Sequence, residues 1–318
     1  MYTTFTILGL TGHVYGLFAA LAACVLLAGM RLSRRLPAGA VSLFGVLGIV
    51  LGIAGARLLY CLCNLSLFTE TYENPALMLN FFDGGLSWPG MVAGLLVAAA
   101  VTAKVHRISF ANVLDVLCIP MGLSMALLRM GEPFTDLGIG KAVQEGFATE
   151  KLGWLFQQSR MGVAVEYRLN VWAYEAFAGV VLFAVMLLLA RRLLKHPGDA
   201  ALCFFTLFGA SQVMLESMRD DGHMLLIFLR VGQLAAALMP LICFGFLASR
   251  IRNACKAAGW IIMALCAALL VVLEFSLDGR LTIGEPSLLR DYCLMALACI
   301  GLAAVPVSVL LKPKHREE

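Results

Sequence analysis

Long apolar runs alternate with short polar stretches along the whole chain, and the runs have the length of membrane-spanning helices. A helix rises ~1.5 Å per residue, so about 20 apolar residues cross the hydrocarbon core of a bilayer. The pattern predicts spans at residues 12–30, 41–63, 88–105, 112–130, 171–190, 199–218, 231–249, 257–276 and 292–311. We therefore expect an all-α polytopic membrane protein with about nine transmembrane helices.

Composition supports the membrane assignment. Hydrophobic residues make up 61% of the chain and charged residues 14%, with a mean hydropathy of +0.89. Soluble domains contain nearly twice that share of charge, so the composition excludes a soluble globular protein. The net charge of +4 comes from short basic clusters at the ends of apolar runs, which is no nucleic-acid-binding pattern.

The cysteines indicate no metal or redox chemistry. Most of the ten lie inside apolar runs, and Cys61 and Cys63 form the only close pair, with no histidine nearby. Such cysteines are typical of small core residues, and we expect neither a metal site nor a disulfide.

Basic residues occur in alternate loops, and this predicts how the chain crosses the membrane. The clusters are Arg31/Arg34/Arg35, Lys104/Arg107, Arg191/Arg192/Lys195, Arg250/Arg252/Lys256 and Lys312/Lys314/Arg317. The positive-inside rule places these on the cytoplasmic side. Loop 64–87 contains no Lys or Arg, and loop 131–170 has mixed charge, so we expect both outside. The N-terminus is then outside and the C-terminus cytoplasmic.

The first apolar run differs from a signal peptide. A signal peptide has positive charge before its apolar core, whereas residues 1–30 contain no Lys or Arg. We expect a retained first helix.

Polar residues inside the predicted spans gather at one depth. The outer half of the membrane would hold His13, Tyr15, Arg57, Trp88, Arg129, Tyr174, Glu175, Gln212, Glu216, Arg219, Arg230 and Gln233. Charges at membrane depth are costly and usually face a cavity or a partner. Asp115 is the exception on the cytoplasmic side, where we expect a helix-capping or packing role.

The spacing of these residues predicts an anion pocket. Gln212, Glu216 and Arg219 lie at i, i+4 and i+7, so they share one helix face. Together with Arg57 and Arg129, this face would give more cations than acids, and guanidinium groups suit phosphate oxygens. The alternative is a set of structural salt bridges, such as Arg129 with Glu216.

A glycine-rich turn precedes the third span. In the segment Asp83-Gly84-Gly85-Leu86-Ser87-Trp88-Pro89-Gly90, the glycines permit positive φ and Pro89 suits a first helical turn. Such a turn can present backbone N–H groups to an anion, so Gly84 and Gly85 are candidate headgroup-binding residues.

Seven short motifs then resemble one family, in that family's order. They are His13-Val14-Tyr15-Gly16-Leu17, Gly55-Ala56-Arg57-Leu58-Leu59-Tyr60, the segment 83–90, Arg129-Met130-Gly131, Tyr174-Glu175, Gly209-Ala210 through Glu216 to Arg219, and Gly232-Gln233. The chain is similar over about residues 12–248 to the phosphatidylglycerol–prolipoprotein diacylglyceryl transferases. This divides it into a transferase-like domain at 1–249, with a cap loop at 131–170, and two additional helices with a basic tail at 250–318.

The resemblance implies a location in a bacterial inner membrane, a chemistry and a set of site residues. The family moves a diacylglyceryl group from phosphatidylglycerol to a cysteine thiol of a lipoprotein precursor, without a cofactor. It needs a base for the thiol and cations for the departing glycerol phosphate. The candidate bases are Glu132, Glu216 and His13. The candidate headgroup ligands are Arg57, Arg129, Arg219, Gly84 and Gly85, and the supporting residues are Tyr15, Asp83, Gln212 and Gln233.

The chain departs from the family pattern at four positions. Pro89 stands where the family has histidine, Glu132 replaces an asparagine, Gln212 replaces an arginine, and Phe208 replaces an aromatic hydroxyl. Three functions stay open from the sequence: a divergent transferase, an enzyme that lipidates another acceptor, or an inactive relative that binds phosphatidylglycerol or another anionic phospholipid. Residues 250–311 could also bind a membrane partner.

Overall fold

The computed structural model describes residues 3–7, 10–72, 74–80, 84–135, 137–144, 147–161, 164–220, 224–226, 229–281 and 288–312. Within these ranges, nine helices are long and apolar enough to cross a membrane. They are α1 (Val14–Leu32), α2 (Ala38–Cys63), α3 (Trp88–His106), α4 (Phe110–Met130), α6 (Val171–Leu193), α7 (Asp199–Met218), α8 (Val231–Leu247), α9 (Asn253–Leu277) and α10 (Leu288–Leu311). The predicted all-α polytopic membrane fold is confirmed, with span boundaries within a few residues of those expected.

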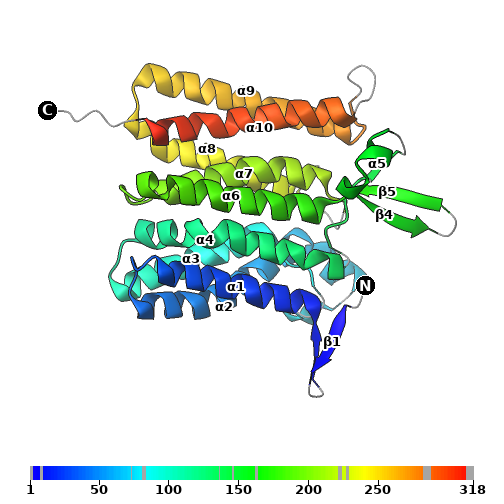
Figure 1. Cartoon of the computed structure of the whole chain (residues 1–318), viewed down its shortest axis with the longest axis horizontal. Coiled ribbons are helices and arrows are strands. Elements are labelled where there is room, and N and C mark those ends of the chain that lie inside the picture. The colour runs from blue at the N-terminus through cyan, green and yellow to red at the C-terminus, as the bar shows by residue number, and fades with distance from the viewer. Residues whose placement is uncertain are drawn as a thin grey trace.

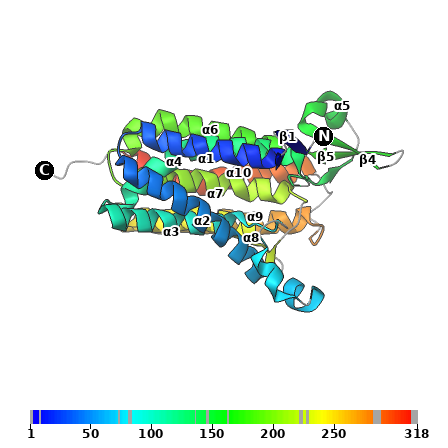
Figure 2. The same cartoon turned by 90° about the horizontal axis from the view of Figure 1, so that it is seen from below.

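The long helices run side by side as a bundle (Figures 1 and 2). In Figure 1, α1 and α2 form one flank, α9 and α10 form the opposite flank, and α4, α6 and α7 lie between them. Most of α7 is buried inside the protein, whereas only a small part of α1 is buried. The helix that bears Gln212 and Glu216 is therefore the central one.

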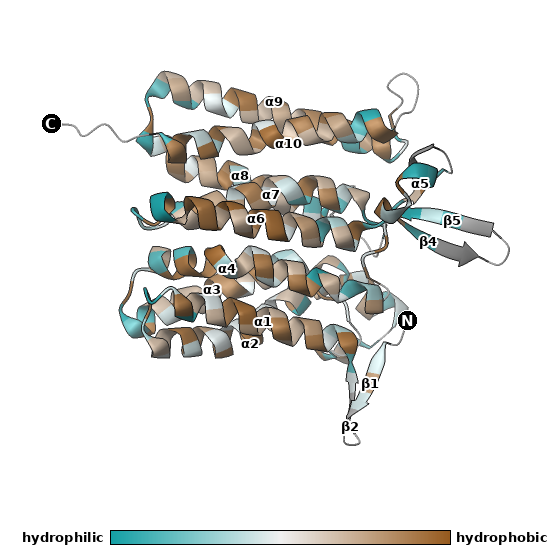
Figure 3. Cartoon of the chain, viewed as in Figure 1, coloured by the Kyte–Doolittle hydropathy of each residue, from teal (hydrophilic) through white to brown (hydrophobic). Residues whose placement is uncertain are grey.

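The outer surface of the bundle is apolar, as a bilayer requires. Figure 3 shows hydrophobic residues along the helices and hydrophilic residues concentrated toward their ends. Leu188 is 83% exposed and Leu32 is 79% exposed. In a lipid solvent such side chains need no protein cover, so the buried positions are the informative ones.

Shorter elements connect the helices. At the N-terminus, β1 (Thr4–Ile7) and β2 (Leu10–His13) form an antiparallel hairpin. Two short helices, η1 (Leu67–Thr71) and η2 (Pro75–Leu79), lie between α2 and α3. The strands β6 (Leu225–Leu226) and β7 (Leu229–Arg230) precede α8, and η6 (Ala248–Arg250) follows α8.

The segment predicted as a cap loop is a small folded unit. It contains η4 (Glu132–Phe134), β3 (Ala142–Val143), α5 (Phe147–Lys151), η5 (Gly153–Leu155), β4 (Phe156–Met161) and β5 (Ala164–Leu169). Its three strands form an antiparallel sheet in the order β3-β5-β4. Figure 1 shows it projecting from the end of the bundle that also bears the N-terminal hairpin.

Asp115 caps the central helix at the opposite end. Its carboxylate accepts hydrogen bonds from the backbone N–H groups of Gly198, at 2.7 Å, and Ala201, at 2.9 Å. These donors lie at the start of α7, where backbone N–H groups have no intrahelical partner. The expected capping role of Asp115 is confirmed.

Glycines let α2 and α3 pack with their backbones almost in contact. A Cβ added at Gly94 would lie 2.0 Å from the carbonyl oxygen of Leu51, and one at Gly90 would lie 2.3 Å from that of Gly55. Small residues at such crossings are typical of membrane helices, which associate by close packing. This contact fixes where α3 places Trp88 at its N-terminal end.

Candidate active site

Four charged side chains meet at one end of the bundle: half-buried Arg129 and buried Glu132, Glu175 and Arg219, called here the charge cluster. Glu175 Oε2 lies 3.0 Å from Arg129 Nε and 2.7 Å from Arg219 Nη1. Glu132 Oε1 pairs with Arg129 Nη1 and lies 3.6 Å from Arg219 Nη2. Each acid therefore contacts both arginines.

The cluster is balanced in charge and shielded from solvent. The side chain of Glu175 is 0% exposed and that of Glu132 is 2% exposed, and the arginine side chains are 15% and 10% exposed. Removing one partner from such a network leaves an uncompensated buried charge, which is strongly destabilising.

The expectation that this site has more cations than acids was wrong, because two arginines here meet two glutamates. The alternative expected structural salt bridges, which are present, but Arg129 pairs with Glu132 and Glu175 and not with Glu216.

Four elements bring these residues together. Arg129 ends α4, and Glu132 follows three residues later in η4, on the same side of the turn. Glu175 lies in the second turn of α6. Arg219 caps the C-terminus of α7 and forms an isolated bridge with Gly140, so the cap unit packs against it.

Gly131 brings the first helix to the cluster. A Cβ at Gly131 would lie 2.9 Å from Phe18 Cβ and 3.1 Å from Tyr15 Cδ2. The ring of Tyr15, a predicted supporting residue, therefore lies against the turn that joins Arg129 to Glu132. The resemblance motif Arg129-Met130-Gly131 has its glycine where α1 leaves no room for a side chain.

Glu216 and Trp88 form a second polar pair. The indole Nε1 of Trp88 donates to Glu216 Oε1 at 2.5 Å, and the Trp88 ring packs edge-on against Phe208 at 5.4 Å between centroids. Glu216 is half-buried, and a Cβ at Gly232 would lie 2.8 Å from its Cδ. Among the described residues, its carboxylate pairs with no arginine.

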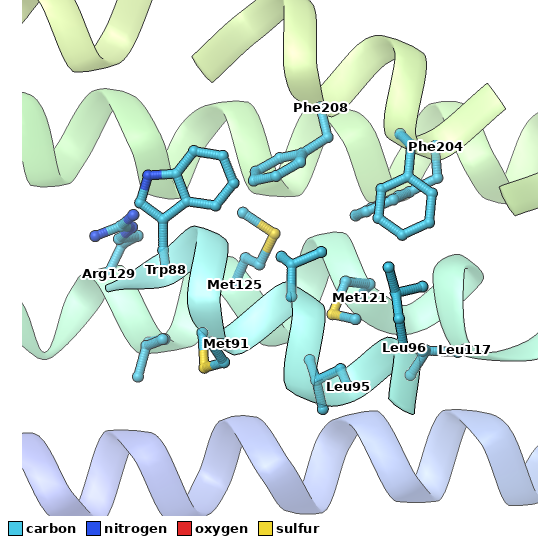
Figure 4. A pocket seen from close by; sticks show the side chains of 13 residues that line it. Trp88, Met91, Leu95, Leu96, Leu117, Met121, Met125, Arg129, Phe204 and Phe208 are labelled. Carbon is cyan, nitrogen blue, oxygen red and sulfur yellow. The ribbon is translucent and has the colours of Figure 1, made fainter. Parts of the chain in front are cut away.

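An apolar cavity of about 70 Å³ ends at Arg129 and Trp88. Figure 4 shows these two side chains at one end, with methionine, leucine and phenylalanine side chains along the rest of its length. It is lined by Trp88, Met91, Val92, Leu95, Leu96, Leu117, Met121, Met125, Leu128, Arg129, Phe204, Phe205 and Phe208, from α3, α4 and α7. An apolar cavity with a cation at one end suits an amphipathic ligand with an anionic head.

Arg57 has no described contact with the charge cluster. Its guanidinium donates to the backbone carbonyls of Leu77 at 2.7 Å, Met78 at 3.0 Å and Gly84 at 2.6 Å. A buried guanidinium has five donors to satisfy, and here backbone carbonyls satisfy them. The prediction that Arg57 shares a cavity with Arg129 is not supported by these contacts, which instead hold the segment between α2 and α3.

The glycine turn directs carbonyl oxygens toward a cation, whereas the prediction was that it directs N–H groups toward an anion. Gly84 and Gly85 have φ of +75° and +63°. In this conformation their carbonyl oxygens, at 2.6 and 3.4 Å, face Arg57 Nη1. The described contacts of both glycines are thus carbonyls toward a cation, and the headgroup role expected for their N–H groups stays a prediction.

A second cavity, of about 310 Å³, lies beside Arg57. Its lining consists of Arg57, Tyr60, Leu67, Phe68, Tyr72, Leu77 and Gly85. The Arg57 guanidinium lies 5.7 Å from the centroid of the Tyr60 ring and 5.4 Å from that of Phe68.

The remaining candidates are dispersed. His13 is exposed at the end of β2, opposite Thr4, and has no described contact with the charge cluster. Gln212 is buried in α7, and within the described part of the chain its Oε1 accepts no hydrogen bond. Gln233 donates to Glu274 of α9 at 2.8 Å. Asp83 lies outside the described residues.

Two residues at the centre of the site had no functional role assigned from sequence. Glu175 follows Tyr174 near the start of a span and was recognised only as part of a two-residue motif. Trp88 had the position of an interfacial aromatic residue. A signal for Glu175 existed, because an acid at the depth of two arginines is their natural counter-charge.

Comparison with known proteins identifies the family. Residues 3–249 match the family model described as prolipoprotein diacylglyceryl transferase. The chain belongs to this family. The resemblance seen in the motifs is confirmed, and α9 and α10 lie outside the matched residues.

Relatives share about a quarter of their residues with this chain. The phosphatidylglycerol–prolipoprotein diacylglyceryl transferase of Symbiobacterium thermophilum is 27% identical over 220 residues, covering 69% of this chain and 80% of the relative. That of Bacillus velezensis is 28% identical over 194 residues, covering 60% and 69%. That of Thermotoga maritima is 26% identical over 216 residues, covering 64% and 68%.

Glu175→Gln should destabilise the protein more than Glu132→Gln. Glu175 Oε2 lies within 3.0 Å of both arginines, so its neutralisation weakens both short contacts at once. Breaking a buried pair typically costs about 3–5 kcal/mol. Thermal or denaturant unfolding in detergent measures the loss, with exposed Glu150→Gln as the control. An E175Q protein as stable as the E150Q protein would contradict the cluster.

Proposed function

We propose that the protein transfers the diacylglyceryl group of phosphatidylglycerol to the lipobox cysteine thiol of a lipoprotein precursor. The observation that supports this most directly is the apolar cavity that ends at Arg129. A phospholipid combines the two properties of this site, since its acyl chains match the apolar wall and its phosphate matches the guanidinium. The names of the relatives supply the two substrates.

Arg129 retains donors for a phosphate. Its Nε contacts Glu175 and its Nη1 contacts Glu132, so among the described contacts Nη2 is left for a ligand. The two acids fix the plane of the guanidinium before a lipid arrives. A preorganised donor of this kind needs little reorganisation when negative charge develops on the departing phosphate.

Glu216 is the residue best placed to act as the base. Glu132 and Glu175 are each engaged by both arginines, and His13 is exposed. Glu216 is half-buried and its carboxylate is held by the Trp88 indole, at the same end of the cavity as Arg129. Geometry within reach of the substrate is the first requirement for a general base.

The reaction then balances without any further reagent. Glu216 accepts the proton of the cysteine thiol, and the thiolate attacks the glyceryl carbon that bears the phosphate. A carbon–sulfur bond forms as the carbon–oxygen bond to the phosphate breaks, and glycerol phosphate leaves with both electrons of that bond. Arg129 and Arg219 lie where they stabilise its charge.

The distribution of charge supports a proposal for the sidedness of the site. The proposed active end holds the cap unit and lies opposite the described basic clusters, so by the positive-inside rule we propose that it faces the extracytoplasmic side of the bacterial inner membrane. Gln158→Cys, at an exposed cap position, should react with a membrane-impermeant maleimide added to spheroplasts. Lys195→Cys, exposed at the opposite end, should react only after lysis. The reverse pattern would contradict this orientation.

Arg129→Lys and Arg129→Gln should both lower transfer by on the order of 100- to 1,000-fold, because a point charge does not reproduce a planar fork and a neutral amide lacks the charge. His13→Asn should lower it much less, since His13 is exposed and outside the cluster. The assays are rescue of a cell depleted of its own diacylglyceryl transferase and direct transfer to a lipobox peptide. If the unmodified protein is inactive in both assays yet binds anionic phospholipid through Arg129, it is an inactive lipid-binding relative and the proposal fails.

Glu216→Gln should lower kcat by about 100- to 10,000-fold, the usual contribution of a general base, while binding of phosphatidylglycerol is retained. Glutamine keeps an acceptor for the Trp88 indole, so the variant removes basicity and little else. The kcat of the purified variant should recover with a lipobox peptide supplied at a pH where the thiol is already ionised. An E216Q enzyme with unchanged kcat would show that another group takes the proton.

A further inference from the structure

One arginine links α9, which lies outside the family match, to the active end of α7. Arg230, at the start of α8, donates from Nη1 to the carbonyl oxygens of Glu216 at 2.9 Å and Arg219 at 3.1 Å. Its Nη2 lies 3.3 Å from Asp278 Oδ1 and its Nε lies 3.6 Å from Glu274 Oε1. Arg230 thus links the last turn of α7 to Glu274 of α9 and to Asp278, the residue that follows α9.

The charge balance of Arg230 depends on this contact. Arg230 is 8% exposed, and its described acidic partners both come from beyond residue 249. Its described partners within the family domain are carbonyl oxygens, which carry no net charge. A buried cation without an acid is costly, so the hairpin of α9 and α10 completes an ion pair that the family domain leaves open.

Further contacts fix the hairpin at this place. Gln233 donates to Glu274 Oε2 at 2.8 Å, which orients that carboxylate toward Arg230. Asp278 also pairs with Lys141 at 3.1 Å, and the Lys141 backbone N–H donates to the carbonyl of Met218 at 2.9 Å. The Tyr292 hydroxyl donates to the carbonyl of Ser217 at 3.4 Å. The hairpin therefore contacts the end of α7 directly at Ser217, and through Arg230 and Lys141 at the neighbouring residues.

We infer that Glu274 and Asp278 are positioning residues for the active site. They hold Arg230 against the carbonyls of Glu216 and Arg219, and so set the direction in which α7 presents the Glu216 carboxylate and the Arg219 guanidinium. The inference rests on the proposed function for the role of those two groups. It makes the C-terminal hairpin part of the catalytic domain, rather than a separate docking element for a membrane partner.

The experiment compares Glu274→Gln, Asp278→Asn and their double variant with Asp291→Asn in the full chain. Asp291 is a matched control, because it is a hairpin acid as buried as Glu274 that accepts from Ser276 at 2.9 Å and Arg290 at 2.8 Å, with no described contact to Arg230. The double variant should lose on the order of 10- to 100-fold in kcat per folded protein, as small misplacements of reacting groups do. The D291N variant should keep its kcat even where its melting temperature falls.

A double-mutant cycle separates positioning from general stability. If Glu274 acts through Arg230, then Glu274→Gln added to Arg230→Gln should lower kcat little beyond R230Q alone. Equal kcat losses in D291N and E274Q, in step with their melting temperatures, would overturn the inference. So would a double variant E274Q/D278N with the kcat of the unmodified protein.

The outcome for the proposed function is read separately, from the unmodified protein. If that protein transfers no lipid to the lipobox peptide, the proposed function fails, and the same variants are compared by binding of phosphatidylglycerol in mixed micelles. The inference then expects about tenfold weaker binding for E274Q/D278N than for D291N, because Arg219 has moved. Equal affinities would overturn it.

Discussion

The structure depends on the rule that charges taken out of water must find partners. Glu175 Oε2 lies between two guanidinium groups from different helices, 3.0 Å from Arg129 and 2.7 Å from Arg219. Because that contact joins the ends of α4, α6 and α7, it fixes the spacing of the three helices around the proposed site. The apolar surfaces that surround the bundle give no comparable direction, since lipid is as good a neighbour for leucine as protein is.

The same rule explains how a site with balanced charge can still bind an anion. Glu132 and Glu175 engage Nη1 and Nε of Arg129, which lines the cavity, and among the described contacts its Nη2 is left for a ligand. The acids therefore hold the arginine in place at the cost of part of its charge. Where the family pattern has asparagine, this chain has Glu132, whose carboxylate also lies near Arg219. That is a change in the support of the arginines rather than in the arginines themselves.

Sequence reasoning reached the spans, their limits and the family, because hydropathy and motif order are properties of the chain itself. It also placed Arg129, Glu216 and Arg219 at one depth. It failed for Arg57, since residue type and depth do not tell whether a guanidinium meets a ligand or the carbonyls of Leu77, Met78 and Gly84. It missed the Trp88–Glu216 bond for a related reason: the pair is 128 residues apart, and only the packing of α3 on α7 brings it together.

The C-terminal hairpin consists of two spans, and that even number has a topological consequence. A pair of antiparallel helices returns the chain to the side of the membrane from which it left, so residue 249 and the end of α10 share a side. A single appended helix would have reversed the tail. Such a pair can therefore be present or absent at the end of a membrane enzyme without inverting any earlier loop, and here it supplies the two acids that pair with Arg230.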